Sequence, residues 1–187
     1  TVGMVLEDVE IRIADLEIED EFKKNGDIGV VEVKGPNVFK GYWKQPEKTK
    51  SEFRDDGYFI TGDMGFLDQD NYLTIVGRNK DLIITGGLNV YPKEIETVID
   101  QDNKVDESAV VGVSHPDFGE GILAIIVEKK GHSINIDVLN ENLRKNLAAY
   151  KLPKKVHVIK ELPRNSMGKV QKNVLRYIYR DEFSDTN

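Results

Sequence analysis

The sequence has 187 residues, which is enough for one ordinary domain or for two small lobes. Its hydrophobic content of 39% and charged content of 32% exclude a fibrous or disordered chain and fit a globular protein. The formal net charge of −7 argues against nucleic acid as the main partner, because binding to a duplex normally needs a basic face. The sequence has no cysteine, which excludes disulfides, thiolate metal sites and a cysteine nucleophile.

The apolar runs and the first residues of the sequence indicate whether it contains a membrane span or a targeting segment. No apolar run approaches the length of a membrane span, and the first ten residues lack a basic region followed by a hydrophobic one. We therefore expect no membrane span. In a sequence without cysteine, an intracellular location, either the cytoplasm or an organellar matrix, is the default expectation. Because the sequence begins with Thr1 rather than Met, we also expect a piece of a longer chain.

Residues 1 to about 80 are predicted to be rich in β-strands. Alternating or β-branched patterns that are typical of strands occur at residues 9–15, 28–35 and 72–78. The segments at residues 55–59 and 68–72 are rich in aspartate, glycine or asparagine and indicate turns.

From Asp81 onward the pattern changes to alternating helices and strands. A helix is predicted over residues 91–100, since Pro92 suits a first helical position and acidic residues near that end favour the helix dipole. Two further helices are predicted from apolar residues at helical spacing, namely Ile136, Leu139, Leu143 and Leu147, and then Val170, Val174 and Ile178. Strands are predicted at residues 107–116, 121–131 and 155–162. The fold class is therefore α+β, with a β-rich piece, a short junction near residues 77–81 and a small α+β lobe.

Asp63 follows a predicted strand in the segment YFITGDMG and lies between two glycines. An acidic side chain presented from such a turn can accept two hydrogen bonds from the diol of a ribose, as in dinucleotide-binding folds. Arg78 ends the predicted strand 72–78, and its fork of donors can bind a sugar or phosphate oxygen. Both residues also have ordinary interpretations, since Gly-Asp turns are common and an arginine at a strand end is usually solvated.

Gly86 and Gly87 stand in tandem between a predicted strand and the helix predicted at residues 91–100. Two missing Cβ atoms permit positive φ angles and let a ligand chain pass close to the backbone. A tight connection between a strand and a helix explains the same pair without any ligand.

Lys169 directly follows Gly168 at the start of the predicted last helix. A Gly-Lys pair is typical of a phosphate-binding P-loop, but that loop also needs an earlier glycine at fixed spacing and a Ser or Thr after the lysine. Val170 follows here, so the segment is not a P-loop. A cation at the head of a helix is disfavoured by the helix dipole, which hints at a purpose for Lys169, although a chance lysine fits this stretch as well.

Several other chemistries are excluded by spacing. His115, His132 and His157 are far apart in the sequence and lack the spacing of metal ligands, so no metal site is predicted. Asp68 and Asp70 begin like a calcium loop, but the glycine that such a loop needs is missing. The Gly-x-Ser-x-Gly motif of serine hydrolases does not occur in the sequence.

Taken in chain order, four segments resemble the acyl-adenylate-forming family of acyl-CoA synthetases, luciferases and nonribosomal peptide adenylation domains. These segments are VKGPNVFKGYW, GYFITGDMG, VGRNKDLIITGGLNVYPKEIE and PRNSMGKVQKN. The segments most similar to malonyl-CoA synthetases are GGLNVYPKEIE, SHPDFGEG and LPRNSMGKVQKNVLR. The resemblance covers essentially the whole chain. It implies that residues 1–79 are the β-rich C-terminal part of the large N-terminal domain, and that residues 80–187 form the small, mobile C-terminal lid domain.

The resemblance also implies a two-step reaction. A carboxylate attacks the α-phosphate of ATP to give acyl-AMP and pyrophosphate, and the thiol of CoA then displaces AMP. Lys169 is implied to be catalytic in the first step, where its ammonium offsets the charge of the two anions. Asp63 and Arg78 are implied to hold the ribose of ATP and then of AMP.

For the second step, the resemblance implies that the small domain rotates about a hinge at Lys80. The rotation would withdraw Lys169 and bring Gly86 and Gly87 in to line the tunnel for the pantetheine arm of CoA.

The phosphate loop and the aromatic adenine-binding segment of this family do not occur in the sequence and are expected upstream, together with the acyl pocket. The chain is therefore expected to need its own N-terminal domain, to be inactive alone, and to leave Mg²⁺ mainly to that missing part. The expected partners are a small carboxylic acid, ATP and CoA. Three alternatives stay open: a ligase for another small or fatty carboxylate, an adenylation domain that delivers to a carrier protein, and a non-catalytic stand-alone binding module.

Overall fold

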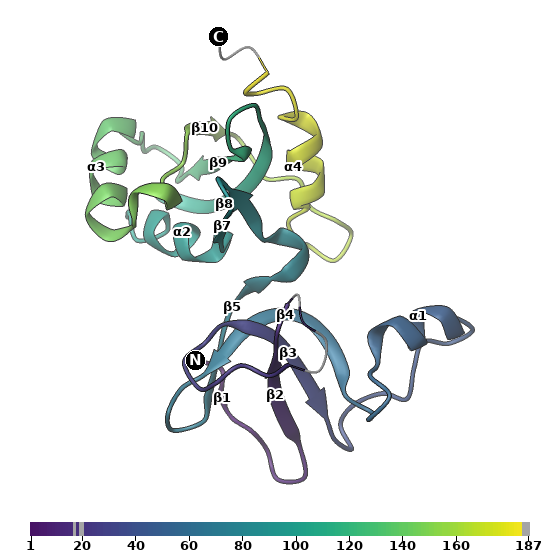
Figure 1. Cartoon of the computed structure of the whole chain (residues 1–187). Helices are drawn as coiled ribbons and strands as arrows, with labels where there is room; N and C mark the ends of the chain where they lie inside the picture. Colours follow the sequence, from purple (N-terminus) through teal and green to yellow (C-terminus); the bar gives the residue numbers. More distant parts are fainter. Residues whose placement is uncertain (17, 19–20, 185–187) are drawn as a thin grey trace. The chain divides into compact units, whose positions relative to one another are not determined.

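The computed structural model describes residues 1–16, 18 and 21–184. It divides into two units, Thr1–Lys80 (unit 1) and Asp81–Asn187 (unit 2), which we describe separately (Figure 1). Each unit contains one five-stranded sheet, and the described helices accompany these sheets in a mixed α+β architecture. The α+β fold class is confirmed. None of the described helices is long and apolar enough to cross a membrane.

Unit 1 is built on an antiparallel sheet with the strand order β1-β5-β4-β3-β2. Its strands are β1 (Gly3–Met4), β2 (Glu10–Ala14), β3 (Gly29–Lys34), β4 (Phe59–Leu67) and β5 (Tyr72–Arg78). The strands predicted at residues 9–15, 28–35 and 72–78 are confirmed as β2, β3 and β5. One face of this sheet carries a small apolar core of Ile13, Val31 and Leu73.

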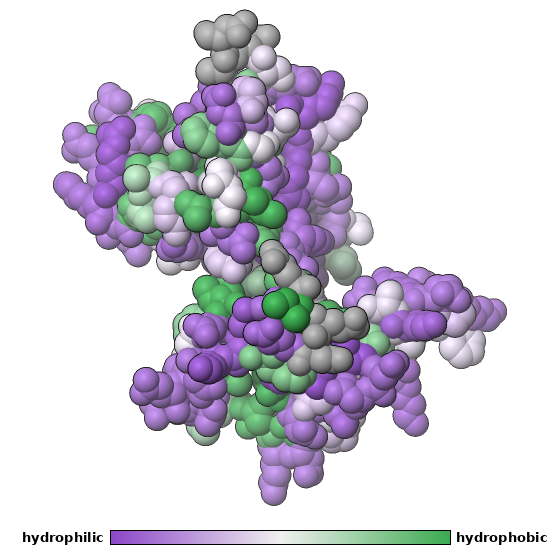
Figure 2. All heavy atoms as spheres, viewed as in Figure 1, coloured by the Kyte–Doolittle hydropathy of each residue, from purple (hydrophilic) through white to green (hydrophobic). Residues whose placement is uncertain are grey.

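A helix that the sequence patterns did not predict, α1 (Pro46–Glu52), precedes β4. None of its residues, all of which the structure describes, is buried. Figure 2 shows mostly hydrophilic side chains over this helix. An apolar stripe at helical spacing is what identifies a helix in a sequence, and α1 has none because it does not pack on a core. Pro46 at its first helical turn is the one local signal.

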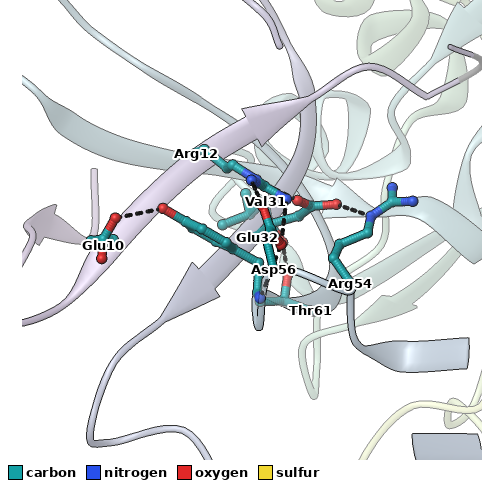
Figure 3. Close-up of polar contacts among 8 residues, drawn as sticks. Glu10, Arg12, Val31, Glu32, Arg54, Asp56 and Thr61 are labelled. Atoms are coloured by element: carbon teal, nitrogen blue, oxygen red, sulfur yellow. Dashed lines mark hydrogen bonds and ion pairs between the residues drawn. The ribbon is translucent and has the colours of Figure 1, made fainter. Parts of the chain in front are cut away.

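The carboxylate of Glu32 lies fully buried in the sheet of unit 1 and joins three segments of the chain (Figure 3). Its two oxygens accept from Arg12 Nε at 2.7 Å and from Arg54 Nε at 2.8 Å. Arg12 also donates to Asp56, and its guanidinium lies 3.8 Å from the ring centre of Tyr58. A buried carboxylate is stable only when it is paired in this way. Glu32 therefore ties β2 and β3 to the loop that leads into β4.

The hydrogen bond from Arg12 lowers the pKa of Asp56 below its ordinary value of 3.8. A carboxyl group with a lowered pKa stabilises the folded state above its ordinary pKa. The contribution of the Arg12–Asp56 contact is therefore present at neutral pH, and it is lost as the pH falls through the lowered pKa.

We expect Glu32→Ala to lower the free energy of unfolding of unit 1 by about 2–4 kcal/mol, because two guanidinium groups lose their buried acceptor. Glu10→Ala is the control, since it removes an exposed carboxylate that accepts one hydrogen bond from Tyr58. Hydrogen exchange of amides in β3 and β4 measures the difference. Equal effects of the two substitutions would contradict a special role for Glu32.

The sheet of unit 2 has the strand order β10-β9-β6-β7, and β8 pairs with β9 outside this path. Its strands are β6 (Ile83–Thr85), β7 (Leu88–Val90), β8 (Val105–His115), β9 (Gly119–Glu128) and β10 (Lys155–Ile159). The strands β8 and β9 form the long antiparallel ladder of the unit, and β10 runs parallel to β9. The strands predicted at residues 107–116, 121–131 and 155–162 are confirmed as β8, β9 and β10.

Helices cover both faces of this sheet, as Figure 1 shows. The helices α2 (Pro92–Ile99) and α3 (Ile136–Asn146) share one core with Val110, Ile122 and Ile126 of β8 and β9. The helix α4 (Lys172–Ile178) contributes Leu175 to a second core on the opposite face, where it meets Val111 and Leu123. Alternate residues of a strand point to opposite faces, so two covered faces explain the nearly continuous apolar runs of β8 and β9. Short 3₁₀ turns lie at Asn79–Asp81 and Ala149–Lys151.

The last helix differs from its prediction. It begins at Lys172, and Val170 instead forms an isolated β-bridge with Arg164. Leu175 is the residue of α4 that is buried, whereas Ile178 is 58% exposed. The prediction placed the stripe wrongly because the β-bridge, a contact outside the helix, fixes Val170.

Candidate functional site

Asp63 and Arg78 form a cross-strand pair in unit 1. Asp63 lies directly opposite Arg78 in the β4–β5 ladder, and Arg78 Nε is 2.7 Å from Asp63 Oδ1. The predicted turn at Asp63 is wrong, since β4 continues to Leu67. The glycine that suggested a turn, Gly62, has a φ of +71°, and the register shifts just after Met64. Glycine within a strand often marks such an irregularity rather than the end of the strand.

Thr61 holds both members of this pair. Its hydroxyl donates to the carbonyl of Val31 at 2.8 Å, as Figure 3 shows, and accepts the backbone N–H of Asp63 at 3.0 Å. The carbonyl of Thr61 accepts from Arg78 Nη1 at 3.2 Å. Sequence reasoning missed Thr61, although a hydroxyl two residues before an aspartate is a known local signal for such a contact.

The Asp63–Arg78 pair is accessible from solvent. The side chain of Asp63 is 28% exposed and that of Arg78 is 52% exposed. A carboxylate has about four acceptor sites, so its ion pair with one guanidinium nitrogen leaves room for the hydroxyls of a sugar. Because Thr61 holds the backbone of Asp63 and the guanidinium of Arg78, and the ladder pairs the two residues, the pair is a preformed binding element for a polar ligand.

We expect Thr61→Val to accelerate hydrogen exchange of the Asp63 amide by about tenfold, because the isosteric side chain cannot accept that N–H. Thr61→Ser retains the hydroxyl and serves as the control. The measurement is residue-resolved exchange by NMR. The interpretation fails if the valine and serine variants exchange at the same rate.

Gly86 and Gly87 form the two-residue turn of a hairpin between β6 and β7, with Thr85 paired to Leu88. Their φ angles are +56° and +78°, which match a turn with positive φ at both central positions. The predicted connection from a strand to a helix is therefore wrong, because three-residue β7 lies between the turn and α2. Both φ angles are positive, which the missing Cβ atoms of the two glycines permit. A Cβ on Gly87 would meet no described atom within 4 Å, so the backbone conformation, rather than crowding within unit 2, accounts for this glycine.

The glycine hairpin lies beside an aromatic residue that sequence reasoning did not single out. The N–H of Gly86 donates to the carbonyl of Phe118 at 2.8 Å, and Thr85 pairs with Gly119 at the start of β9. The ammonium of Lys154 lies 4.0 Å from the ring centre of Phe118, which is 39% exposed. The hairpin is thus fixed to the turn between β8 and β9, next to an apolar ring and a cation.

Lys169 is exposed and lies in a short hairpin over residues 164–170, closed by the bridge between Arg164 and Val170. Gly168, just before it, has a φ of +77°. Because α4 begins only at Lys172, Lys169 does not head the helix, and the predicted conflict with the helix dipole is wrong. The side chain of Lys169 is presented to solvent from a turn.

Two ion pairs fix this hairpin to the rest of unit 2. Arg164 pairs with Glu107 near the start of β8. On the other side, Lys172 Nζ lies 2.5 Å from Oε1 of Glu96, a buried residue of α2 that also accepts the N–H of Val110 at 2.9 Å. Both ion pairs therefore connect to β8, since Glu107 belongs to this strand and Glu96 is hydrogen-bonded to its residue Val110.

The two candidate elements of unit 2 therefore lie at opposite ends of one ladder. The Lys169 hairpin is attached at Glu107, whereas the glycine hairpin is attached beyond His115, at the turn before β9. At about 3.3 Å per residue, the strand from Glu107 to His115 is about 26 Å long. Lys80 lies in the 3₁₀ turn at the end of unit 1.

No metal centre accompanies these elements in the part of the chain that the structure describes. No group of three or more histidine, aspartate or glutamate residues there could hold a metal ion.

Comparison with known proteins gives consistent matches. Residues 94–169 match the family model described as AMP-binding enzyme C-terminal domain. A 2-succinylbenzoate–CoA ligase of Geobacillus sp. (strain WCH70) is 40% identical over 150 residues, which are 80% of this chain and 30% of that protein. A long-chain-fatty-acid–CoA ligase of Haemophilus influenzae is 41% identical over 176 residues, which are 94% of this chain and 31% of that ligase.

The solved structure of ATP-bound MatB from Rhodopseudomonas palustris is 57% identical, with a TM-score of 0.89 over 97% of this chain and 36% of that one. The structure of MatB without ligand is 56% identical, with a TM-score of 0.73 over 98% of this chain and 37% of that one. This chain therefore spans roughly a third of the length of these relatives.

Proposed function

Because this chain belongs to the AMP-binding, acyl-CoA ligase family and corresponds to the C-terminal portion of its members, we propose that it is part of an AMP-forming acid–CoA ligase. The complete protein forms an acyl-AMP from a carboxylic acid and ATP, and then an acyl-CoA. This chain contributes the end of the large domain, residues 1–79, and the small domain, residues 80–187. By itself it is inactive, since the phosphate loop and the acyl pocket belong to the preceding part.

The observation that carries this proposal is the separation of the two elements in unit 2. The Lys169 hairpin and the Gly86–Gly87 hairpin are attached to opposite ends of β8, about 26 Å apart by strand length. One orientation of a rigid unit cannot bring both elements to one reacting centre. A two-step reaction that needs a cation first and an open passage for a thiol afterwards fits this arrangement.

Lys169 serves the first step. The attacking carboxylate and the α-phosphate of ATP bring two anions together, and a compact ammonium on a flexible stem can orient both and offset the developing charge. The exposed position of Lys169 on an anchored hairpin supports this role.

Lys80 is the hinge for the change between steps. It is the last residue of unit 1, and a few backbone angles at such a boundary can absorb a domain rotation. The two structures of MatB match this chain with TM-scores of 0.89 and 0.73 at nearly the same identity, which supports a change of conformation in this region of the relative.

The remaining elements bind the nucleotide and CoA. Asp63 and Arg78 hold the ribose of ATP and then of AMP, for which their fixed and accessible carboxylate and guanidinium are suited. Gly86 and Gly87 line the passage for the pantetheine arm, and the open space around Gly87 in unit 2 supports this assignment. Mg²⁺ supplies positive charge to the phosphates of ATP, and its ligands are expected in the preceding part of the protein.

We further propose malonate as the acid. The segments from Gly86 to Glu96, from Ser114 to Gly121 and from Leu162 to Arg176 are similar to malonyl-CoA synthetases. The 57% identity with MatB, a malonyl-CoA synthetase, exceeds the identities of 40% and 41% with the 2-succinylbenzoate and long-chain-fatty-acid ligases. Release of pyrophosphate by the complete protein with malonate, methylmalonate, acetate and longer acids tests this choice.

We expect Lys169→Ala in the complete protein to reduce formation of acyl-AMP by 100-fold or more, by analogy with the loss of a donor to a developing oxyanion, about 10²–10³-fold. The conversion of supplied acyl-AMP to acyl-CoA should stay unchanged, because the lysine is withdrawn in that step. Pyrophosphate exchange and thioester formation measure the two steps separately. Equal loss of both would refute the assigned role.

We expect Gly87→Trp to block the use of CoA while pyrophosphate exchange persists, because the indole fills the proposed passage. Gly131→Trp is a matched control: Gly131 has a φ of +80°, close to the +78° of Gly87, and a Cβ added there would likewise meet no described atom within 4 Å. The control variant carries the same backbone strain away from the passage. If exchange vanished as well, or if both variants lost the use of CoA, the tunnel assignment would be wrong.

A further inference from the structure

The hairpin that carries Lys169 is built around one side chain, that of Asn165. The Oδ1 atom of Asn165 accepts the backbone N–H of Met167 at 3.0 Å and that of Lys169 at 2.9 Å. The backbone N–H of Asn165 donates to the carbonyl of Lys169 at 3.0 Å, and its carbonyl accepts the N–H of Gly168 at 2.9 Å. Both backbone polar groups of Lys169 are therefore bonded to the same residue.

Arg164 connects this hairpin to the sheet. Its Nη1 donates to the carbonyl of Gly168 at 2.6 Å, and its Nη2 pairs with Glu107 of β8. The peptide unit that joins Gly168 to Lys169 is thus held by Asn165 from inside the turn and by Arg164 from the sheet.

Lys172 differs from Lys169 because its ammonium is already occupied by an ion pair and is not available to a ligand. The side chain of Lys172 is 18% exposed, and its ammonium is engaged by buried Glu96 at 2.5 Å. It therefore serves as an anchor at the start of α4. Lys169, three positions earlier, has its backbone fixed while its side chain remains exposed.

We propose that Asn165 is a positioning residue for the first step of the reaction and that Arg164 supports it. The proposal rests on the function proposed above for Lys169. With the backbone of Lys169 fixed, only the side-chain torsions remain to be ordered when its ammonium meets the two anions. Small errors in the placement of a reacting group are costly, since a displacement of about 1 Å can reduce a rate about 100-fold.

The test compares Asn165→Ala with Asn165→Asp in the complete protein. The aspartate keeps an acceptor oxygen in place of Oδ1, whereas the alanine removes it. We expect Asn165→Ala to lower kcat for acyl-AMP formation by about 10–100-fold, with KM for ATP within about twofold. Asn165→Asp should recover most of the rate. Conversion of supplied acyl-AMP to acyl-CoA should be unchanged in both variants.

Two controls separate positioning from a loss of stability. Asn146→Ala removes an exposed asparagine of α3 and should affect neither step. Arg164→Lys keeps a cation near Glu107 but loses the second arm to Gly168, and since Arg164 is 44% exposed its replacement leaves folding intact. We expect it to lower the rate of the first step by about 3–10-fold, which keeps the proposal testable should Asn165→Ala fold poorly.

The outcomes distinguish this inference from the proposed function. Full activity of Asn165→Ala, or an equal loss of both steps, overturns the positioning role of Asn165. Lys169→Ala assayed in parallel decides the other point: if it leaves acyl-AMP formation intact, the proposed role of Lys169 fails. If Lys169→Ala abolishes the first step while Asn165→Ala and Arg164→Lys do not slow it, the inference about Asn165 alone is wrong.

Discussion

Asn165 accepts the backbone N–H of Lys169 and donates its own N–H to the carbonyl of Lys169. Our account of unit 2 depends on this pair of hydrogen bonds, which we call the bracket. In the function proposed above, Lys169 acts on anions bound outside unit 2, so its side chain has to remain exposed. Exposed residues at turns are usually the least ordered part of a fold. The hairpin resolves this conflict by bonding the backbone within the turn. Arg164 then transfers the position of the turn to β8 through Glu107. The side chain stays available for chemistry.

The ladder of β8 and β9 connects the Lys169 hairpin to the rest of unit 2. Apolar cores cover both of its faces, so the ladder is a rigid rod that carries the Lys169 hairpin toward one end and the Gly86–Gly87 hairpin at the other. In unit 1, Glu32 and Thr61 similarly join strands to the segment that presents Asp63. In both units, therefore, buried or backbone-directed polar contacts fix the base of a side chain whose tip is exposed.

The sequence predicted those parts of the fold that burial dictates. α3 was predicted because its apolar residues repeat at helical spacing, and β8 and β9 because their apolar runs are typical of buried strands. α2 was predicted because Pro92 and the acidic residues near it mark the start of a helix. α1 was missed because none of its described residues packs on a core, and β7 was missed because a strand of three residues is too short to show a pattern. The glycine beside Asp63 predicted a turn, but the structure accommodates it as an irregularity within β4.

The candidate site was predicted in part. Lys169 was identified from a resemblance to a family. The bracket formed by Asn165 could not be predicted from the sequence, since it depends on the path of the backbone through the turn.

Hydrogen exchange of the Lys169 amide in the complete protein tests that bracket most directly. Our account predicts exchange at least about tenfold slower than in a free peptide of residues 162–176, as expected for one amide hydrogen bond of ordinary strength. Exchange at the rate of the free peptide would contradict it.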